Sequence, residues 1–251
     1  MFSTASNGDL PWRERALARG LEGSRTRSVE RLDRFVGATR DLANETGTSA
    51  FTVQQVTERA GLSLKSFYRC FAGKDDLLVA LLEEDSLLGA AILSEVVEAQ
   101  ASATDRVRAY VLGIFDLITH PGALGYAALL VREYRRLAEE CPDDLRRALA
   151  PMVDLLAEQI EGAVDGSPTS GEDAGRDART AFALLLDGIH EVTLGRVDAR
   201  DQAEYLWRFC AGALGIDHSD ADRLVSVQGA PDRLVPDQPV SVPDAPDQEL
   251  R

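Results

Sequence analysis

Lys65, Ser66, Tyr68 and Arg69 form a short polar set within residues 51–71, FTVQQVTERAGLSLKSFYRCF. Their chemistry suits the surface of a DNA duplex. The ammonium pairs with phosphates, the hydroxyls reach the backbone or base edges, and the guanidinium can fork onto guanine. The set therefore indicates nucleic-acid binding, provided that the surrounding chain holds these side chains on one outward face.

Two short helices are predicted to hold them there. Thr52 and Gln55 have the spacing of a capping box, which satisfies two backbone N–H groups at the start of the first helix. Gly61 can adopt the left-handed conformation that ends it, and Ser63 is suited to cap the second. Two helices of this length with a Gly-containing turn predict a helix-turn-helix. The expected apolar faces consist of Phe51, Val53, Val56 and Ala60, then Leu64, Phe67 and Phe71.

The run T-V-x-x-V-x-x-x-A-G-L-S-x-x-S-F-Y-R-x-F-x-x-K-D-D-L-L resembles the DNA-binding domain of TetR-family transcription regulators, over about residues 26–85. The resemblance implies a homodimeric repressor that a small molecule releases from DNA. It also implies phosphate or base contacts at Thr52, Ser63, Ser66, Tyr68 and Lys74. The chain departs from the family at Lys65, where a small residue is usual, so the operator of a relative cannot be transferred.

Two plainer interpretations compete with DNA binding. A Gly-containing corner between helices occurs in many all-α proteins, and aromatic residues at helical spacing are more often core than contact. Phe67 and Phe71 are accordingly assigned to the core. Tyr68 is compatible with either role, because its ring can pack while its hydroxyl reaches a phosphate. The combined spacing favours the DNA interpretation.

The net charge of −15 is distributed unevenly. Residues 1–76 hold 12 Lys and Arg against 10 Asp and Glu, whereas the remaining residues hold 15 against 32. Both lysines, Lys65 and Lys74, lie in or beside the expected DNA-reading element. An acidic remainder repels DNA and directs the basic end toward the duplex.

The whole chain reads as all-α, with an N-terminal three-helix helix-turn-helix domain followed by a larger helical ligand-binding and dimerisation domain. A first helix is expected over 28–46 and further helices at about 74–99, 104–118, 124–140, 142–164, 176–196 and 201–215. The expected domains are a flexible N-terminal arm at 1–23, the DNA-binding domain at 24–73, the ligand-binding and dimerisation domain at 74–217, and a disordered acidic Pro-rich tail at 218–251. Arginines in the arm could instead reach the minor groove.

The middle helices carry apolar and aromatic residues that could line a small-molecule site between helices. Each one taken singly is more often plain core. Together they predict a largely apolar, uncharged effector. The candidate ligand-binding residues are Tyr110, Ile114, Phe115, Leu124, Tyr126, Tyr134, Met152, Leu156, Phe182 and Leu186.

The expected helix at 176–196 is apolar almost all round and needs cover on two sides, and small residues in both of the last two helices allow close approach of backbones. In the TetR family these helices pair with their copies, which implies a homodimer here. The candidate interface residues are Gly188, Val192, Gly195, Phe209, Ala211 and Gly212.

No catalytic constellation or metal-ligand spacing stands out, so we expect no enzyme activity, cofactor or metal site. Cys70, Cys141 and Cys210 are widely separated and predict buried thiols. The sequence shows neither a signal peptide nor an apolar run of about 18 residues, so a cytoplasmic protein with no membrane partner is expected. The remaining alternatives are a regulator that answers to a protein partner or activates, and a helical enzyme with a structural helix-turn-helix.

Overall fold

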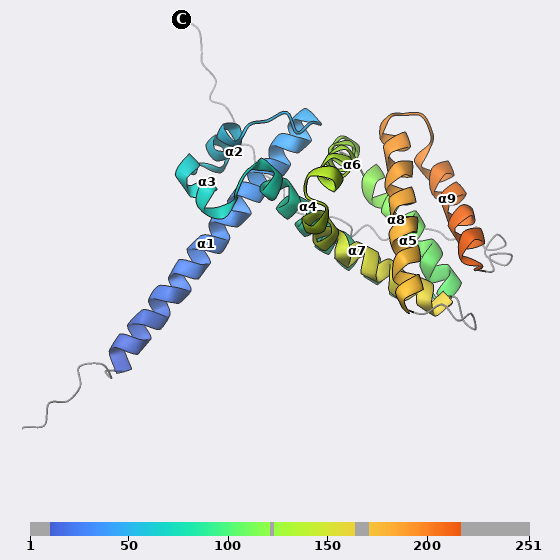
Figure 1. Ribbon diagram of the computed structural model, residues 1–251, viewed down its shortest axis with the longest axis horizontal. Helices are drawn as coiled ribbons and strands as arrows, with labels where there is room; N and C mark the ends of the chain where they lie inside the picture. Colours follow the sequence, from blue (N-terminus) through green and yellow to red (C-terminus); the bar gives the residue numbers. More distant parts are fainter. Residues whose placement is uncertain (1–10, 121–122, 164–170, 217–251) are drawn as a thin grey trace, which may run out of the picture.

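The computed structural model describes residues 11–120, 123–163 and 171–216, and within these ranges every regular element is a helix (Figure 1). The all-α prediction is confirmed. The described residues form nine helices in order: α1 (Pro11–Thr46), α2 (Val53–Ala60), α3 (Leu64–Cys70), α4 (Lys74–Glu98), α5 (Ala103–Thr119), α6 (Ala123–Glu140), α7 (Pro142–Ala163), α8 (Gly171–Thr193) and α9 (Ala199–Leu214). The predicted tail at 218–251 lies outside the described residues.

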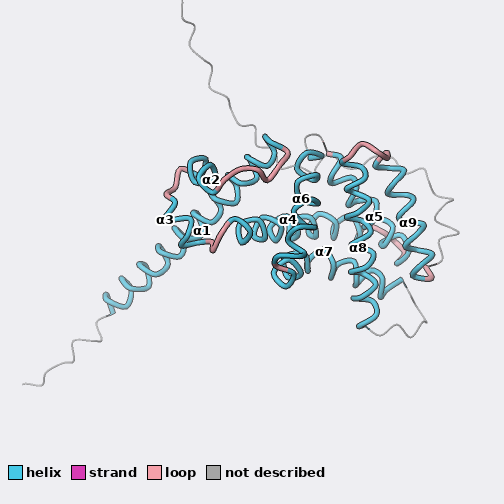
Figure 2. Tube along the Cα trace, turned by 45° about the horizontal axis from the view of Figure 1, so that its top comes forward, coloured by secondary structure: helices cyan, strands magenta, loops and turns pink. Residues whose placement is uncertain are grey.

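Two buried clusters organise these helices. The first joins α1, α2 and α3 to the beginning of α4, and extends to parts of α6 and α7 through Leu129, Leu137 and Leu145. The second fills the space between the rest of α4 and helices α5–α9. Because α4 contributes to both, it connects the helix-turn-helix to the larger domain, and Figure 2 shows it running between the two.

The helix-turn-helix forms through the local signals expected from the sequence. The Thr52 hydroxyl accepts a hydrogen bond from the Gln55 N–H at 3.2 Å, and the Gln55 side chain accepts one from the Thr52 N–H at 2.7 Å. Gly61 ends α2 at φ 61°, in the left-handed region. The Ser63 hydroxyl then caps α3 by accepting from the Ser66 N–H at 3.1 Å.

An aromatic cluster fixes α3 against α1. The Phe67 ring lies 5.5 Å from that of Phe35 in an edge-to-face arrangement, and the Phe71 ring lies 6.1 Å from it. Phe67 and Phe71 are buried, as predicted. Leu64 was wrongly assigned to the same face. It occupies the first position of α3 and is 48% exposed.

Two helix starts differ from the prediction. The apolar stripe of the first helix begins near Ser28, but α1 already begins at Pro11, so its first turns cover part of the predicted arm. Pro is suited to a first helical position because its missing N–H would be unpaired there anyway. Likewise α8 begins at Gly171, five residues before the helix start expected at 176. In both cases the helix extends beyond its apolar periodicity.

Among the described residues, no single helix is long and apolar enough to cross a membrane. Only α5 and α6 taken together meet the criterion of length and composition, as a pair bent by 113°.

Candidate functional site

The outward face of α3 carries the predicted DNA-reading side chains. Lys65 and Arg69 are exposed, and Tyr68 is 58% exposed although its neighbour Phe67 is fully buried. Ser66 is half-buried. Tyr68 therefore presents most of its ring and its hydroxyl to solvent, which leaves it available to a duplex. The exposed side chains combine two cations and a phenol, a set suited to a major groove.

Thr52 and Ser63 are placed at the N-termini of α2 and α3, where each hydroxyl accepts one backbone hydrogen bond. A hydroxyl that accepts still has its own proton to donate. Both residues are exposed, so each proton can reach a phosphate oxygen without breaking the cap. The family-implied contacts at these two positions fit this geometry.

Lys74 is placed differently from the other candidates. Its ammonium donates to the Ser49 carbonyl and lies 4.7 Å from the centre of the Phe51 ring. The side chain is half-buried, and loss of hydration lowers the pKa of Lys74 below its usual range. This cation therefore joins the start of α4 to the loop before α2, and only part of it is open to DNA.

Sequence reasoning missed a basic groove between α1 and α3. It encloses about 230 Å³, and its walls include Arg31 of α1 and Arg69 of α3. The Arg31 guanidinium donates to the Ser28 hydroxyl at 2.9 Å. No local pattern announces this groove, because Arg31 and Arg69 meet only once α3 has packed on α1. The Arg31 guanidinium of α1 thus adds to the positive charge that Arg69 of α3 offers to phosphates.

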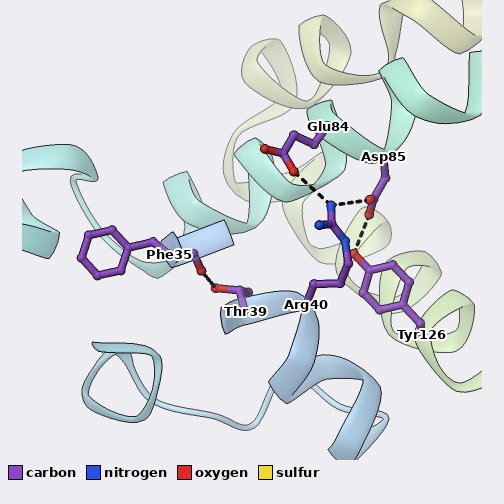
Figure 3. A network of polar contacts seen from close by, with 6 residues as sticks. All are labelled: Phe35, Thr39, Arg40, Glu84, Asp85 and Tyr126. Atoms are coloured by element: carbon purple, nitrogen blue, oxygen red, sulfur yellow. Dashed lines mark hydrogen bonds and ion pairs between the residues drawn. The ribbon is translucent and has the colours of Figure 1, made fainter. Parts of the chain in front are cut away.

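A polar network joins the DNA-binding domain to the larger domain (Figure 3). Arg40 of α1 donates to Glu84 at 3.0 Å and to Asp85 at 2.9 Å, both on α4. The second oxygen of Asp85 accepts from the Tyr126 hydroxyl of α6 at 2.5 Å. Burial raises the pKa of Asp85, and the Tyr126 and Arg40 contacts oppose that shift.

A second tie lies farther along α6. Glu133 is 4% exposed, accepts from the Ser49 hydroxyl, and also accepts from Arg136 at 2.9 Å. Arg136 reaches Asp75 at the beginning of α4, at 2.6 Å, and this contact lowers the pKa of the Asp75 carboxyl. Helix α6 thus contacts the DNA-binding end of the molecule at two points.

A cavity of about 290 Å³ opens beside α4 and is walled by side chains from α4 to α8. Its lining is apolar apart from a few hydroxyls and one carboxyl. Six of the ten candidate ligand residues line it: Ile114, Tyr126, Tyr134, Met152, Phe182 and Leu186.

The other four candidates do not line this cavity. Tyr110 is fully buried and donates to the Met152 carbonyl at 2.8 Å, and Leu156 is 1% exposed, so both are core. Phe115 is also core, packed near Gly188. Leu124 is 43% exposed at the start of α6. Helical periodicity cannot separate wall from core, because both face inward.

A second cavity, of about 440 Å³, adjoins the first and shares Tyr134, Leu149 and Phe182 with it. Its walls include Arg146, Arg147 and Arg179. The first two of these pair with acidic residues one helical turn earlier on α7, and both are largely exposed.

The predicted interface residues fall into two groups. Phe209 is 50% exposed, and Gly195 and Gly212 are exposed as well, so all three are open to a second copy. Val192 and Ala211 are buried within the chain.

Gly188 belongs with the buried group. A Cβ there would lie 2.4 Å from Leu206 of α9 and 3.2 Å from Phe115 of α5. The close approach that Gly188 permits is therefore between helices of the same chain.

An exposed recognition helix on a capped helix-turn-helix, joined by one helix to a cavity-bearing bundle, defines a DNA-binding regulator of two-part design. Residues 35–81 match the family described as bacterial regulatory proteins, tetR family. The chain therefore carries the DNA-binding domain of the tetR family at residues 35–81, as its sequence resemblance indicated.

Solved structures share the fold. A putative TetR-family transcriptional regulator from Rhodococcus sp. aligns with a TM-score of 0.58 and 26% identity, over 74% of this chain and 99% of its own. The regulator FadR from Bacillus subtilis, in complex with stearoyl-CoA, aligns with a TM-score of 0.58 and 18% sequence identity. The alignment covers 70% of this chain and 96% of FadR. RolR in complex with resorcinol aligns with a TM-score of 0.60 and 16% sequence identity, over 80% of this chain and 95% of RolR. The sequence matches no curated protein.

Proposed function

We propose that this chain is a homodimeric repressor, that it binds an inverted-repeat operator through α3, and that a small, largely apolar ligand releases it. The observation that carries the proposal is the place of the cavity. Its wall is built from α4, the helix that begins directly after the helix-turn-helix. A ligand that displaces α4 moves the attachment of the recognition helix.

The surface of α9 supports the homodimer. Tyr205 and Phe209 are 55% and 50% exposed, and their rings stack 6.4 Å apart. Leu194 and Val197 add exposed apolar area in the connection between α8 and α9. Neighbouring apolar side chains of this size mark interaction surfaces more often than free ones. A twofold dimer presents two copies of α3 and requires half-sites separated by about one DNA turn or a multiple of it.

The nature of the cavity supports a ligand with little charge. Its wall is dominated by leucine, isoleucine and aromatic side chains. FadR and RolR, which share the fold, are solved with stearoyl-CoA and resorcinol, so the architecture accommodates small molecules. To act as a switch, the ligand must favour the DNA-free state by about 1–3 kcal/mol, the range of ordinary coupling.

The test begins with DNA. Fragments retained by the purified protein from a random pool are sequenced, and an inverted repeat is the expected result. The Lys65→Ala/Arg69→Ala double variant should lose retention. The matched Arg146→Ala/Arg147→Ala variant, which removes two exposed cations from α7, should keep it.

The retained complex is then titrated with small apolar molecules. Release, together with weaker ligand binding in the presence of operator, supports the switch, because linkage is reciprocal. Sequence-specific retention that no small molecule changes would favour the alternative regulator, which answers to a protein partner. Retention without sequence preference would contradict the proposal.

A further inference from the structure

Ser86 of α4 is a buried hydroxyl without a partner. Ser86 is 4% exposed, and its hydroxyl oxygen makes no hydrogen bond to any described part of the chain. Helical serines commonly bond back to the carbonyl four residues earlier, but Ser86 does not. A buried hydroxyl left unpaired costs free energy, so such a group calls for an explanation.

The explanation is suggested by where Ser86 lies. It lines the cavity next to Asp85 on the same helix, and Tyr126 of α6 completes the set. We call these three residues the polar corner. The remainder of the wall is almost wholly apolar, so this corner is where a ligand in the cavity finds its hydrogen-bonding partners.

The charges around the corner limit what can bind. Asp85 is the only carboxyl in the wall, and no Lys, Arg or His side chain lines the described cavity. Arg40 holds one Asp85 oxygen at 2.9 Å from outside the cavity wall. An anionic ligand would thus meet a carboxylate and no lining cation, whereas an uncharged hydroxyl can donate to Asp85 or to Ser86 and accept from Ser86.

Resting on the proposed function of this cavity, we infer that its ligand is an uncharged apolar molecule bearing a hydroxyl or similar donor, which hydrogen-bonds to Ser86 at the polar corner. The apolar body fills the space between α4 and α8. The polar group satisfies the buried hydroxyl of Ser86, which has no hydrogen-bond partner within the described chain.

The same corner explains how occupancy reaches DNA. Asp85 divides its two oxygens between Tyr126 of α6 and Arg40 of α1. A ligand hydroxyl that approaches Asp85 competes with the Tyr126 hydroxyl for one of them. The position of the Asp85 side chain then depends on the ligand, and so does its ion pair with Arg40. The carboxylate of Asp85 therefore belongs both to the proposed ligand site and to the contact with the DNA-binding domain.

Three probes of one ring system test the inference: naphthalene, 2-naphthol and 2-naphthoate. Their affinities are measured by calorimetry on the full chain without DNA. The expected order is 2-naphthol first, by about three- to tenfold over naphthalene from one net hydrogen bond, and 2-naphthoate last. Ser86→Ala should remove the advantage of 2-naphthol and leave naphthalene binding unchanged.

The control is Ser94→Ala, which deletes a hydroxyl from the same helix outside the cavity, where Ser94 bonds to Glu98 at 3.1 Å. It should keep the wild-type order, and both variants should melt as wild type does. Equal binding of 2-naphthoate and 2-naphthol would overturn the inference, as would a preference for 2-naphthol that survives Ser86→Ala, or no binding of any probe.

These titrations contain no DNA, so their outcome is separate from that of the proposed function. If the expected order appears but no probe or related alcohol releases operator, the ligand class stands and the repressor switch fails. If ligands release the operator but bind the Ser86→Ala variant as tightly as wild type, the proposed switch is supported and the inferred role of the polar corner is contradicted.

Discussion

The ammonium of Lys74 lies 4.7 Å from the centre of the Phe51 ring and donates a hydrogen bond to the carbonyl of Ser49. The first residue of α4 is thereby fastened to the segment that leads into α2. Glu133 of α6 accepts from the Ser49 hydroxyl, so the same segment also contacts the larger domain. The lysine that the family resemblance assigns to phosphate contact is thus part of the junction between domains.

Lys74→Ala should therefore lower stability as well as DNA affinity. We expect a loss of about 1–2 kcal/mol in the free energy of unfolding, from one hydrogen bond and one cation–aromatic contact. Denaturant unfolding measures it. Lys65→Ala is the matched control, because Lys65 is exposed and should leave stability unchanged while reducing the salt slope of DNA binding by about one unit. Equal stability of the two variants would contradict a structural role for Lys74.

Arg69→Ala should remove base discrimination. If the guanidinium binds guanine through two hydrogen bonds, the loss is about 1–3 kcal/mol on the operator and little on unrelated DNA. Competition binding with operator and scrambled duplexes measures the ratio. Arg146→Ala removes a cation of 67% side-chain exposure from α7 and should leave this ratio unchanged. A uniform loss on both duplexes would instead assign Arg69 to phosphate.

The local parts of this site could be predicted from sequence, and the tertiary parts could not. The capping box of Thr52 and Gln55, the left-handed Gly61 and the cap at Ser63 all act within a few residues, so spacing alone reveals them. The burial of Phe67 and Phe71 follows from the same helix. Because these local signals agree with one another, the helix-turn-helix can be predicted from the sequence.

Contacts between segments that are distant in the chain produce no comparable local pattern in the sequence. Gly188 reads as a surface glycine until α9 places Leu206 against it. Phe115 and Met152 have the same inward pattern, yet only Met152 reaches the cavity. The Arg40–Asp85 pair joins residues 45 positions apart, so neither residue marks the other in the sequence. Packing between helices decides each of these roles.

Phe209→Asp should convert the proposed homodimer to a monomer. A charge placed at the centre of an apolar contact between copies must be buried without a partner, which opposes association. Light scattering at micromolar concentration gives the mass. Leu87→Asp is the matched control, because Leu87 is 54% exposed on α4 and lies outside the α8–α9 surface. If both variants keep the wild-type mass, the α9 surface is not the interface.

Cys210 should be the slowest thiol to react in the folded protein. It is 4% exposed, and burial raises its pKa to about 11, so the reactive thiolate is scarce at neutral pH. Cys70 and Cys141 are half-buried. Iodoacetamide labelling followed by peptide mass spectrometry should find Cys210 modified last, with a rate that rises as pH approaches 11. Early modification of Cys210 under native conditions would show that α9 opens readily from the bundle.

Arg40→Gln should uncouple the ligand cavity from DNA. The side chain holds Glu84 and Asp85 from α1, so its charge carries the connection between the helix-turn-helix and the cavity wall. We expect the variant to bind operator and ligand separately, while ligand affinity becomes nearly the same with and without DNA. The wild-type difference should be about 1–3 kcal/mol.

The control for this uncoupling is Arg59→Gln, which breaks a charged pair of 2.7 Å between α2 and Glu45 of α1, both inside the DNA-binding domain. Calorimetric titrations of each variant, alone and with saturating operator, give the coupling directly. The Arg59 variant should retain the wild-type difference. If Arg40→Gln also retains it, the signal travels through the apolar contacts of α4 alone, and the Arg40–Asp85 pair only fastens the two domains together.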